Sequence, residues 1–146
     1  MTHRGKYEFN YLGLGHIVSQ KGLEMSPDKI KTVLDWNLSS IDSIEKVRSF
    51  LGLCSYYRKF IQNFSKIATP LTDLTKKDVD VAHEVRTEAC QEGLRMLVAA
   101  ITSAPVLTAT RSDRQFIVKT DAASTLGLGG VLSQLDDDGH ERVIAY

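Results

Sequence analysis

The sequence predicts an α+β fold in which a helical segment is followed by antiparallel strands. Two observations indicate this fold class. Apolar residues recur at helical spacing from about residue 27 to residue 101, and from residue 115 onward strand-forming residues alternate with glycine-rich and aspartate-rich turns. The chain has 146 residues, 42% hydrophobic and 25% charged, which is the composition of an ordinary globular protein with one core or two small ones.

The N-terminal elements are a short strand or hairpin and one helix. Residues 11–19 contain glycines and end in Ile-Val-Ser, which suggests a hairpin that closes at Lys21-Gly22. Ser26 is a good N-cap, and Pro27 suits the first helical position because its missing N–H has no partner there. A helix is therefore expected from Pro27 to about Trp36.

The longest expected helix runs from Asp42 to Phe64. Asp42 and Glu45 form a start that resembles a capping box, and apolar residues then follow at helical spacing as far as Ile61.

A second face of this helix carries Arg48, Gly52 and Tyr56, at positions i, i+4 and i+8. Gly52 needs a reason, because glycine inside a helix costs roughly 0.5–1 kcal/mol relative to alanine. Close packing against another helix and close approach of a ligand such as a nucleic-acid backbone are both possible explanations. The sequence pattern alone does not choose between them.

Two further helices precede the strands. Thr69 and Pro70 are expected to begin a short helix that ends in the polar residues 75–80, which we interpret as a linker. Apolar spacing predicts another amphipathic helix over residues 90–101, which stops before Pro105.

The last third is expected to form an antiparallel meander. Residues 115–120 and 131–135 have strand-forming composition, and the glycines of residues 127–130 are expected to interrupt the strands. Residues 136–139 predict a turn into a final strand at 142–146. The three aspartates of that turn could also suggest a metal site, but acidic residues before a glycine between strands more often form a solvated turn.

Single polar and sulfur-containing residues give fewer indications of function. Asp121 follows an apolar strand, where a carboxylate could bind a metal or simply end the strand in a turn. Cys54 and Cys90 lack CxxC spacing and lie on apolar stripes, so both are expected to be reduced thiols in the core. The histidines are scattered, and we expect them to be exposed or locally bonded.

The charges are unevenly distributed although they cancel overall. Residues 1–77 hold 12 of the 18 basic and 7 of the 18 acidic residues, so the two halves carry about +5 and −5. This asymmetry is compatible with a phosphate-contacting surface beside an acidic site, and equally with solvated faces. The N-terminus lacks a signal peptide and no apolar run could span a bilayer, so we expect an intracellular protein without membrane contact, in the cytoplasm or nucleus.

Several motifs resemble those of one family. The segment FLGLCSYYRKFI, Phe50 to Ile61, resembles the FLGLxxYYRxFI block of reverse transcriptases from gypsy-type LTR retrotransposons. Other blocks of that family follow in the expected order, namely LGHIVSQKGLEMSPDKI, FSKIATPLTDLTKK, SAPVL and TDA…GLGGVLSQ. The resemblance covers nearly the whole chain from Tyr11.

The resemblance implies a division of the chain. Residues 1–36 would form the end of the reverse transcriptase palm, residues 37–77 the helical thumb, and residues 78–107 the connection helix. Residues 108–146 would form the N-terminal strands of a mixed sheet like that of ribonuclease H, truncated before the domain is complete.

The resemblance also implies a nucleic-acid-binding site. The thumb-helix face of Arg48, Gly52 and Tyr56, with Arg58 and Lys59, would hold an RNA–DNA or DNA duplex, the template-primer. The remaining parts of the pol polyprotein are further expected partners.

The same resemblance implies a metal role for Asp121. This residue matches the first of the carboxylates that hold two Mg²⁺ ions for RNA hydrolysis in the ribonuclease H domain. Its partner acids would lie beyond Tyr146, and no Tyr-x-Asp-Asp polymerase motif occurs in the chain. We therefore expect a fragment that is inactive alone. The alternatives are a residual nucleic-acid-binding module and a non-functional relic of a transposable element.

Overall fold

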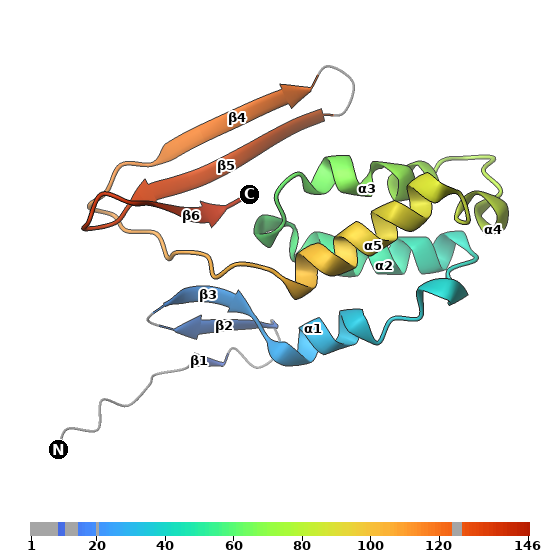
Figure 1. The fold of residues 1–146 in the computed structure, drawn as a ribbon, viewed down its shortest axis with the longest axis horizontal. Coiled ribbons are helices and arrows are strands. Elements are labelled where there is room, and N and C mark those ends of the chain that lie inside the picture. Colours follow the sequence, from blue (N-terminus) through green and yellow to red (C-terminus); the bar gives the residue numbers. More distant parts are fainter. Residues whose placement is uncertain (1–8, 11–14, 20, 124–126) are drawn as a thin grey trace.

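The computed structural model describes residues 9–10, 15–19, 21–123 and 127–146. Figure 1 shows the helices gathered at one end of the molecule and two separate three-stranded sheets at the other. The elements in chain order are β1 (Phe9–Asn10), β2 (His16–Ser19), β3 (Gly22–Met25), α1 (Pro27–Leu34), α2 (Ile44–Tyr56), α3 (Phe64–Asp73), α4 (Val81–Glu84), α5 (Glu88–Thr102), β4 (Ile117–Ala123), β5 (Gly127–Leu135) and β6 (Glu141–Ala145), with 3-10 turns at Leu38–Ser40 and Arg58–Phe60.

The expected N-terminal hairpin is present as antiparallel β2 and β3, in which Ser19 pairs with Gly22. The part of that prediction that concerns residues 11–14 lies outside the described residues. Gly22 has a φ of 128°, and a Cβ there would lie 2.0 Å from the carbonyl oxygen of Leu107. This close approach lets Leu23 and Leu107 exchange two backbone hydrogen bonds of 2.7 Å, which join the hairpin to the segment after α5.

The start of α1 confirms the sequence prediction. Ser26 accepts a hydrogen bond from the backbone N–H of Lys29, and Pro27 is the first helical residue. Trp36, just after the helix, packs edge-on against Phe50 of α2 with ring centroids 5.7 Å apart. This contact ties α1 to the helical core.

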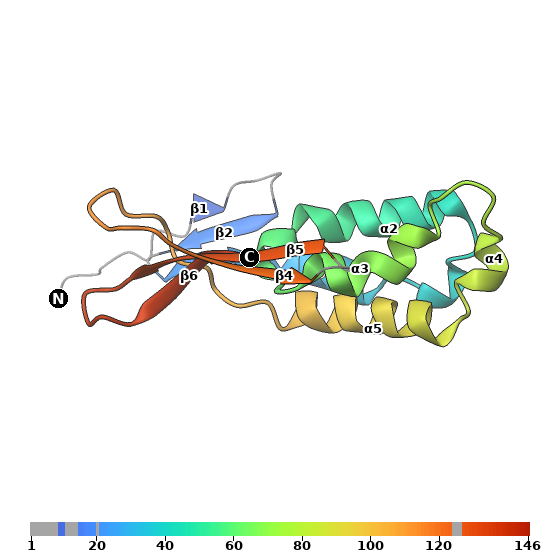
Figure 2. The ribbon, with the colours of Figure 1, turned by 90° about the horizontal axis from the view of Figure 1, so that it is seen from above.

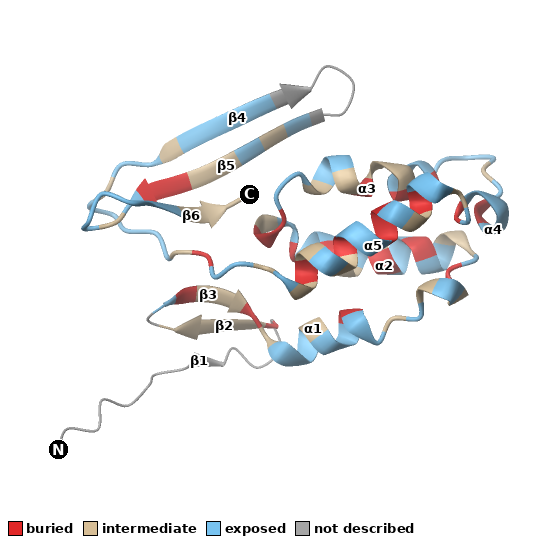
Figure 3. Cartoon of the chain, in the orientation of Figure 1, coloured by how far each residue is buried: buried red, intermediate tan, exposed pale blue. Residues whose placement is uncertain are grey.

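The residues that the structure describes form one hydrophobic core, which lies mainly among the helices. In Figure 2, α3 lies between α2 and α5, and the buried residues in Figure 3 line the inward faces of these helices. Gly93 of α5 allows α3 to approach closely, because a Cβ at this position would lie 3.1 Å from the carbonyl oxygen of Ile67. The fully buried aliphatic and aromatic members include Val33, Val47, Phe50, Tyr57, Phe60, Leu71, Leu94, Leu97, Ile101 and Leu107.

The expected helix from Asp42 to Phe64 is wrong at both ends. Its N-cap is Ser43, whose hydroxyl accepts from the N–H of Lys46, and the helix ends at Tyr56. A 3-10 turn follows at Arg58–Phe60. Asn63 then has a φ of 60°, in the left-handed region. Asparagine tolerates this conformation, and it redirects the chain into α3.

One prediction between residues 64 and 85 also needs correction. α3 begins at Phe64, so Pro70 lies inside the helix and does not start one. The burial of Ala68 and Leu71 against the core outweighs the backbone hydrogen bond that the proline cannot donate. Residues 75–80, interpreted from the sequence as a linker, contain no helix or strand and join α3 to α4, where Val81 and the C-cap Val85 are buried.

The final strands form the predicted antiparallel meander, in the order β4-β5-β6. The expected interruption at residues 127–130 is wrong, because these glycines lie within β5 and pair with residues 120–123 of β4. Backbone hydrogen bonds to β4 keep these glycines in the strand. The sequence does not show this, because glycine has no side chain that could contribute to an alternating pattern. All strand pairs that the structure describes are antiparallel, so the parallel pair that a mixed sheet requires is not among them.

Candidate nucleic-acid interface

The exposed face of α2 carries the three residues singled out from the sequence. Arg48, Gly52 and Tyr56 are all exposed, and a Cβ at Gly52 would meet no described atom within 4 Å. Packing within the described chain therefore does not explain this glycine. The glycine that serves helix packing is Gly93, for which the sequence pattern predicts no role.

The ring of Tyr56 is positioned by its neighbours. It packs edge-on against Tyr57, with centroids 4.9 Å apart, and lies 5.3 Å from the imidazole of His16 on β2. His16 also stacks on Phe60 at 5.7 Å. We expected the histidines to be exposed or locally bonded, and this expectation is wrong for His16. The contact between β2 and the end of α2 joins segments far apart in the sequence, so no local pattern predicts it.

Arg58 and Lys59 follow α2 in the 3-10 turn, so they do not continue its exposed line. The guanidinium of Arg58 lies 5.5 Å from the centroid of the Phe64 ring, and the ammonium of Lys59 lies 5.6 Å from that of Phe60. Contact with a ring face restrains a cation without neutralising its charge. The backbone carbonyl of Lys59 accepts a 2.9 Å hydrogen bond from Tyr146 N–H, which joins this turn to the end of the C-terminal sheet.

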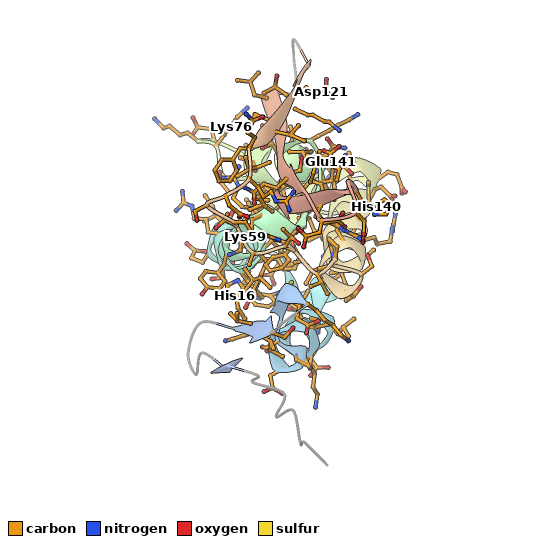
Figure 4. All side chains as sticks on the ribbon, turned by 90° about the vertical axis from the view of Figure 1, so that its left-hand side faces the viewer. His16, Lys59, Lys76, Asp121, His140 and Glu141 are labelled. Atoms are coloured by element: carbon orange, nitrogen blue, oxygen red, sulfur yellow. The ribbon has the colours of Figure 1, made fainter. Side chains whose placement is uncertain are left out.

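A cleft of about 450 Å³ separates the start of α3 from the C-terminal sheet. Arg58 and Lys66 line its helical wall, and Asp121 and Gly129 line the strand wall. Figure 4 shows Asp121 on the far side of the molecule from His16, with Lys59 between them. The cleft thus brings Asp121 near Arg58, whereas the exposed face of α2 is a separate surface.

Asp121 is exposed in β4, in register with Gly129 of β5. Magnesium prefers near-octahedral oxygen coordination, and two-metal hydrolysis needs several carboxylates around ions about 4 Å apart. Within the described ranges, the one cluster of three or more possible metal ligands is Asp136, Asp138 and His140, which does not include Asp121. The described residues therefore do not fit a magnesium site at Asp121.

The cluster at Asp136 is a turn, as the composition predicted. The Asp136 carboxylate accepts hydrogen bonds from the N–H groups of His140 (2.8 Å) and Asp138 (3.0 Å), and from the Arg142 guanidinium (2.8 Å). The His140 N–H and the Arg142 guanidinium lower the pKa of Asp136. These donors already use the oxygens that a cation would need.

Both cysteines are buried free thiols, as predicted. Burial raises the pKa of Cys54 to about 12, so this thiol stays protonated and is a poor metal ligand. No helix in the part of the chain that the structure describes is long and apolar enough to cross a membrane.

Sequence comparison matches residues 87–146 to the RNase H-like domain found in reverse transcriptase. The Retrovirus-related Pol polyprotein from transposon 297 of Drosophila melanogaster is 38% identical over 135 residues, which are 92% of this chain and 12% of that protein. The corresponding polyprotein from transposon gypsy of the same organism is 36% identical over 132 residues, 83% of this chain and 12% of that protein. The chain thus spans about an eighth of the length of these relatives.

Comparison with solved structures gives the same relationship. The foamy viral protease-reverse transcriptase in complex with an RNA/DNA hybrid superposes with a TM-score of 0.73 and 25% sequence identity. The superposition covers 96% of this chain and 18% of that one. Nearly all of this chain therefore has the fold of one segment of a longer enzyme.

Proposed function

The chain is a segment of a retrotransposon Pol polyprotein with a reverse transcriptase and RNase H-like fold, and we propose that it holds a nucleic-acid duplex against the exposed face of α2. We further propose that residues 37–77 act as the thumb. Residues 1–36 would then belong to the palm, residues 78–107 to the connection and residues 108–146 to the RNase H-like part. The family match begins at residue 87 and so includes α5, which this division assigns to the connection.

The open backbone at Gly52 is the observation that carries the proposal. A helix without a side chain at one exposed position allows a sugar-phosphate chain to approach the backbone, with the cation of Arg48 one turn before and the ring of Tyr56 one turn after. A glycine costs helix stability, and packing within the described chain does not compensate for that cost. Contact with a ligand accounts for it.

Charge and homology support the same surface. Arg58 and Lys59 lie off this face, in the 3-10 turn after the helix, and we propose that they contact phosphates farther along the same duplex. The foamy viral enzyme of similar fold was solved with an RNA/DNA hybrid. We accordingly propose that either an RNA–DNA or a DNA duplex binds here.

Asp121 is proposed as a carboxylate of the RNase H-like part of the whole polyprotein. With one carboxylate at this position and no Tyr-x-Asp-Asp sequence in the chain, we expect the purified chain neither to extend a primer nor to cleave an RNA–DNA hybrid. Magnesium-dependent cleavage that disappears in Asp121→Asn would contradict this expectation.

Fluorescence anisotropy with labelled RNA–DNA and DNA duplexes at low salt tests the binding. We expect weak affinity that falls steeply with salt and depends little on base sequence, because phosphate contacts release counterions. Arg48→Ala should weaken binding and reduce the salt slope by roughly one contact. Lys31→Ala, which removes an exposed cation on α1, is the matched control and should leave the slope unchanged.

A second pair of variants tests the glycine directly. Gly52→Leu should weaken duplex binding while helix content stays the same or rises, because leucine is a better helix former than glycine. Ala99→Leu places the same side chain on an exposed position of α5 and should not affect binding. Absence of duplex binding at low salt, or equal affinity of Gly52→Leu and Ala99→Leu, would favour a relic without a binding role.

A further inference from the structure

His16 connects the exposed ring of Tyr56 to the buried aromatic residues at the end of α2. Its imidazole lies 5.3 Å from the ring of Tyr56, 5.5 Å from that of Tyr57 and 5.7 Å from that of Phe60. Ring centroids of favourable aromatic pairs lie at such distances. Tyr57 and Phe60 are almost completely buried, whereas Tyr56 is 49% exposed. The imidazole is therefore in contact both with the core and with the ring that a duplex on the α2 face would meet.

The backbone of His16 is held against the helices by its neighbours. The Ser26 N–H donates a 3.0 Å hydrogen bond to the carbonyl of Gly15, and His16 pairs with Met25 in the ladder between β2 and β3. Met25 is buried in the core, and Ser26 caps α1. Figure 4 shows His16 where this hairpin meets the helices. The strand thus presents the imidazole from a fixed position.

Gly15 permits the close approach of β2 to the end of α2. Its φ is 67°, and a Cβ there would overlap the hydroxyl oxygen of Tyr57 and lie 2.9 Å from Cγ of Lys29. A side chain at this position would push the hairpin away from the helices. The glycine therefore serves the contact between His16 and the rings of α2.

Two aromatic groups restrain the ring of Tyr56. The ring of Tyr57 meets it edge-on, with an interplanar angle of 88°, and the imidazole of His16 lies against it at 42°. An exposed side chain without such neighbours samples several rotamers, and a ligand that binds it must restrict them at a cost in entropy. A ring that is already held in place avoids part of this cost. Preorganisation of this kind raises affinity without an additional contact to the ligand.

We propose that His16 is a positioning residue of the duplex interface, which holds the ring of Tyr56 in the orientation that packs on the sugars of a bound duplex. This inference rests on the proposed function of the α2 face. It gives β2 a part in duplex binding that acts through Tyr56. The cations of that surface, such as Arg48, contact the phosphates, and the imidazole does not.

Anisotropy titration of the full chain with the labelled RNA–DNA duplex tests the proposal. His16→Ala removes the imidazole and should weaken binding by roughly 2- to 10-fold, because Tyr56 must then be ordered on binding. His16→Phe keeps an aromatic ring and should bind as tightly as the original chain. Val18→Ala, which shortens a side chain on the same strand, is the matched control and should also leave the affinity unchanged. The salt slope should be the same in all three variants, because none removes a phosphate contact.

A double-mutant cycle with Tyr56→Leu shows whether His16 acts through Tyr56. Tyr56→Leu alone should weaken binding, and His16→Ala should then have no further effect. In the chain without a duplex, the NMR resonances of the Tyr56 ring should shift in His16→Ala and not in Val18→Ala, since only the first variant removes a neighbouring ring. Circular dichroism should be the same for all of these variants.

Five results would overturn the role of His16. They are full affinity of His16→Ala, an equal loss in Val18→Ala, an equal loss in His16→Phe, a loss in His16→Ala that persists in the Tyr56→Leu background, and a reduced salt slope in His16→Ala, which would indicate a direct phosphate contact. If Tyr56→Leu weakens binding and His16→Ala does not, the proposed function stands and the positioning role fails. If the original chain does not bind the duplex, or if Tyr56→Leu binds as tightly as the original chain, both are rejected.

Discussion

The helical part and the C-terminal sheet are stabilised in different ways. All buried apolar residues that the structure describes lie between Met25 and Leu107, whereas the buried residues of β4 to β6 are the polar Ser133 and Gln134 (Figure 3). Burial of apolar surface is the main stabilising force of a fold, and the sheet has little of it. The difference indicates that the helices can form a core by themselves, while the sheet depends on its polar contacts.

The polar contacts of the sheet are hydrogen bonds made by the buried side chains of Gln134 and Ser133. Gln134 donates from its side-chain amide to the carbonyls of Arg111 and Arg114, and its amide oxygen accepts from Arg111 N–H. Ser133 donates to Glu141, which also binds Lys119. Two backbone hydrogen bonds, Thr108 N–H to the carbonyl of Val143 and Tyr146 N–H to the carbonyl of Lys59, connect the sheet to the rest of the molecule.

The largest effect is expected from a change in the helical core. Phe50→Ala removes a ring that is 1% exposed and packs against Trp36, and it should lower the free energy of unfolding by about 3–5 kcal/mol. Urea denaturation followed by circular dichroism measures the change. Val118→Ala in β4, where the side chain is largely exposed, is the control and should have almost no effect. Equal losses of unfolding free energy in Phe50→Ala and Val118→Ala would mean that β4 belongs to the same hydrophobic core as the helices.

A smaller loss is expected when the sheet loses its buried amide. Gln134→Ala leaves the carbonyls of Arg111 and Arg114 without this donor, at a cost of about 1–3 kcal/mol. Hydrogen exchange should show the loss of protection confined to residues 108–115 and the sheet, with the helices unchanged. The exposed Gln115→Ala is the control. Loss of protection throughout the helices would contradict the separation of the two parts.

On the outer surface of the helical part, Gly52→Ala should raise the free energy of unfolding by about 0.5–1 kcal/mol, because alanine is the better helix former and a Cβ meets open space. Gly93→Ala should not share this gain, since its Cβ would lie 3.1 Å from the carbonyl oxygen of Ile67. Thermal denaturation of the two variants compares them directly. A destabilised Gly52→Ala would show that something covers this face.

The smallest expected effect is a loss of stability at low pH. Hydrogen bonds from the His140 N–H and the Arg142 guanidinium lower the pKa of Asp136 below its ordinary 3.8, and Lys119 and Ser133 lower the pKa of Glu141 below 4.5. A lowered folded-state pKa stabilises the fold above the unfolded-state value and loses that contribution as the pH falls through the folded-state value. Both carboxylates are in contact with solvent, which screens them, so the effect is small.

Hydrogen exchange below pH 4 should therefore show the β5–β6 hairpin opening before the helices. Asp136→Asn keeps the shape of the side chain but removes the charge, and it should reduce this pH dependence of the hairpin. Two results would contradict a role of the carboxylates. One is protection of the hairpin from hydrogen exchange that stays constant down to pH 2, and the other is an unchanged pH dependence in Asp136→Asn.

The candidate interface could be predicted in part. The spacing of Arg48, Gly52 and Tyr56 places them on one face of any helix through this segment, because that follows from the helical repeat alone. That this face is open, and that His16 contacts Tyr56, depends on which elements pack together, and no local pattern contains that information. The same limit applies to helix packing, which depends on Gly93 and not on Gly52.

Several features follow from local sequence alone, since capping, turn chemistry and apolar periodicity act over a few neighbouring residues. These features are the α+β class, the cap at Ser26, the helix after residue 87, the turn at residues 136–139 and the buried thiols. The other features depend on tertiary packing. It ended α2 at Tyr56, because the burial of Tyr57 and Phe60 outweighs the continuing helical pattern. Packing against the core keeps Pro70 inside α3, and ladder hydrogen bonds with the neighbouring strand β4 keep the glycines of residues 127–130 inside β5, because these interactions exceed local propensities of about 1–3 kcal/mol.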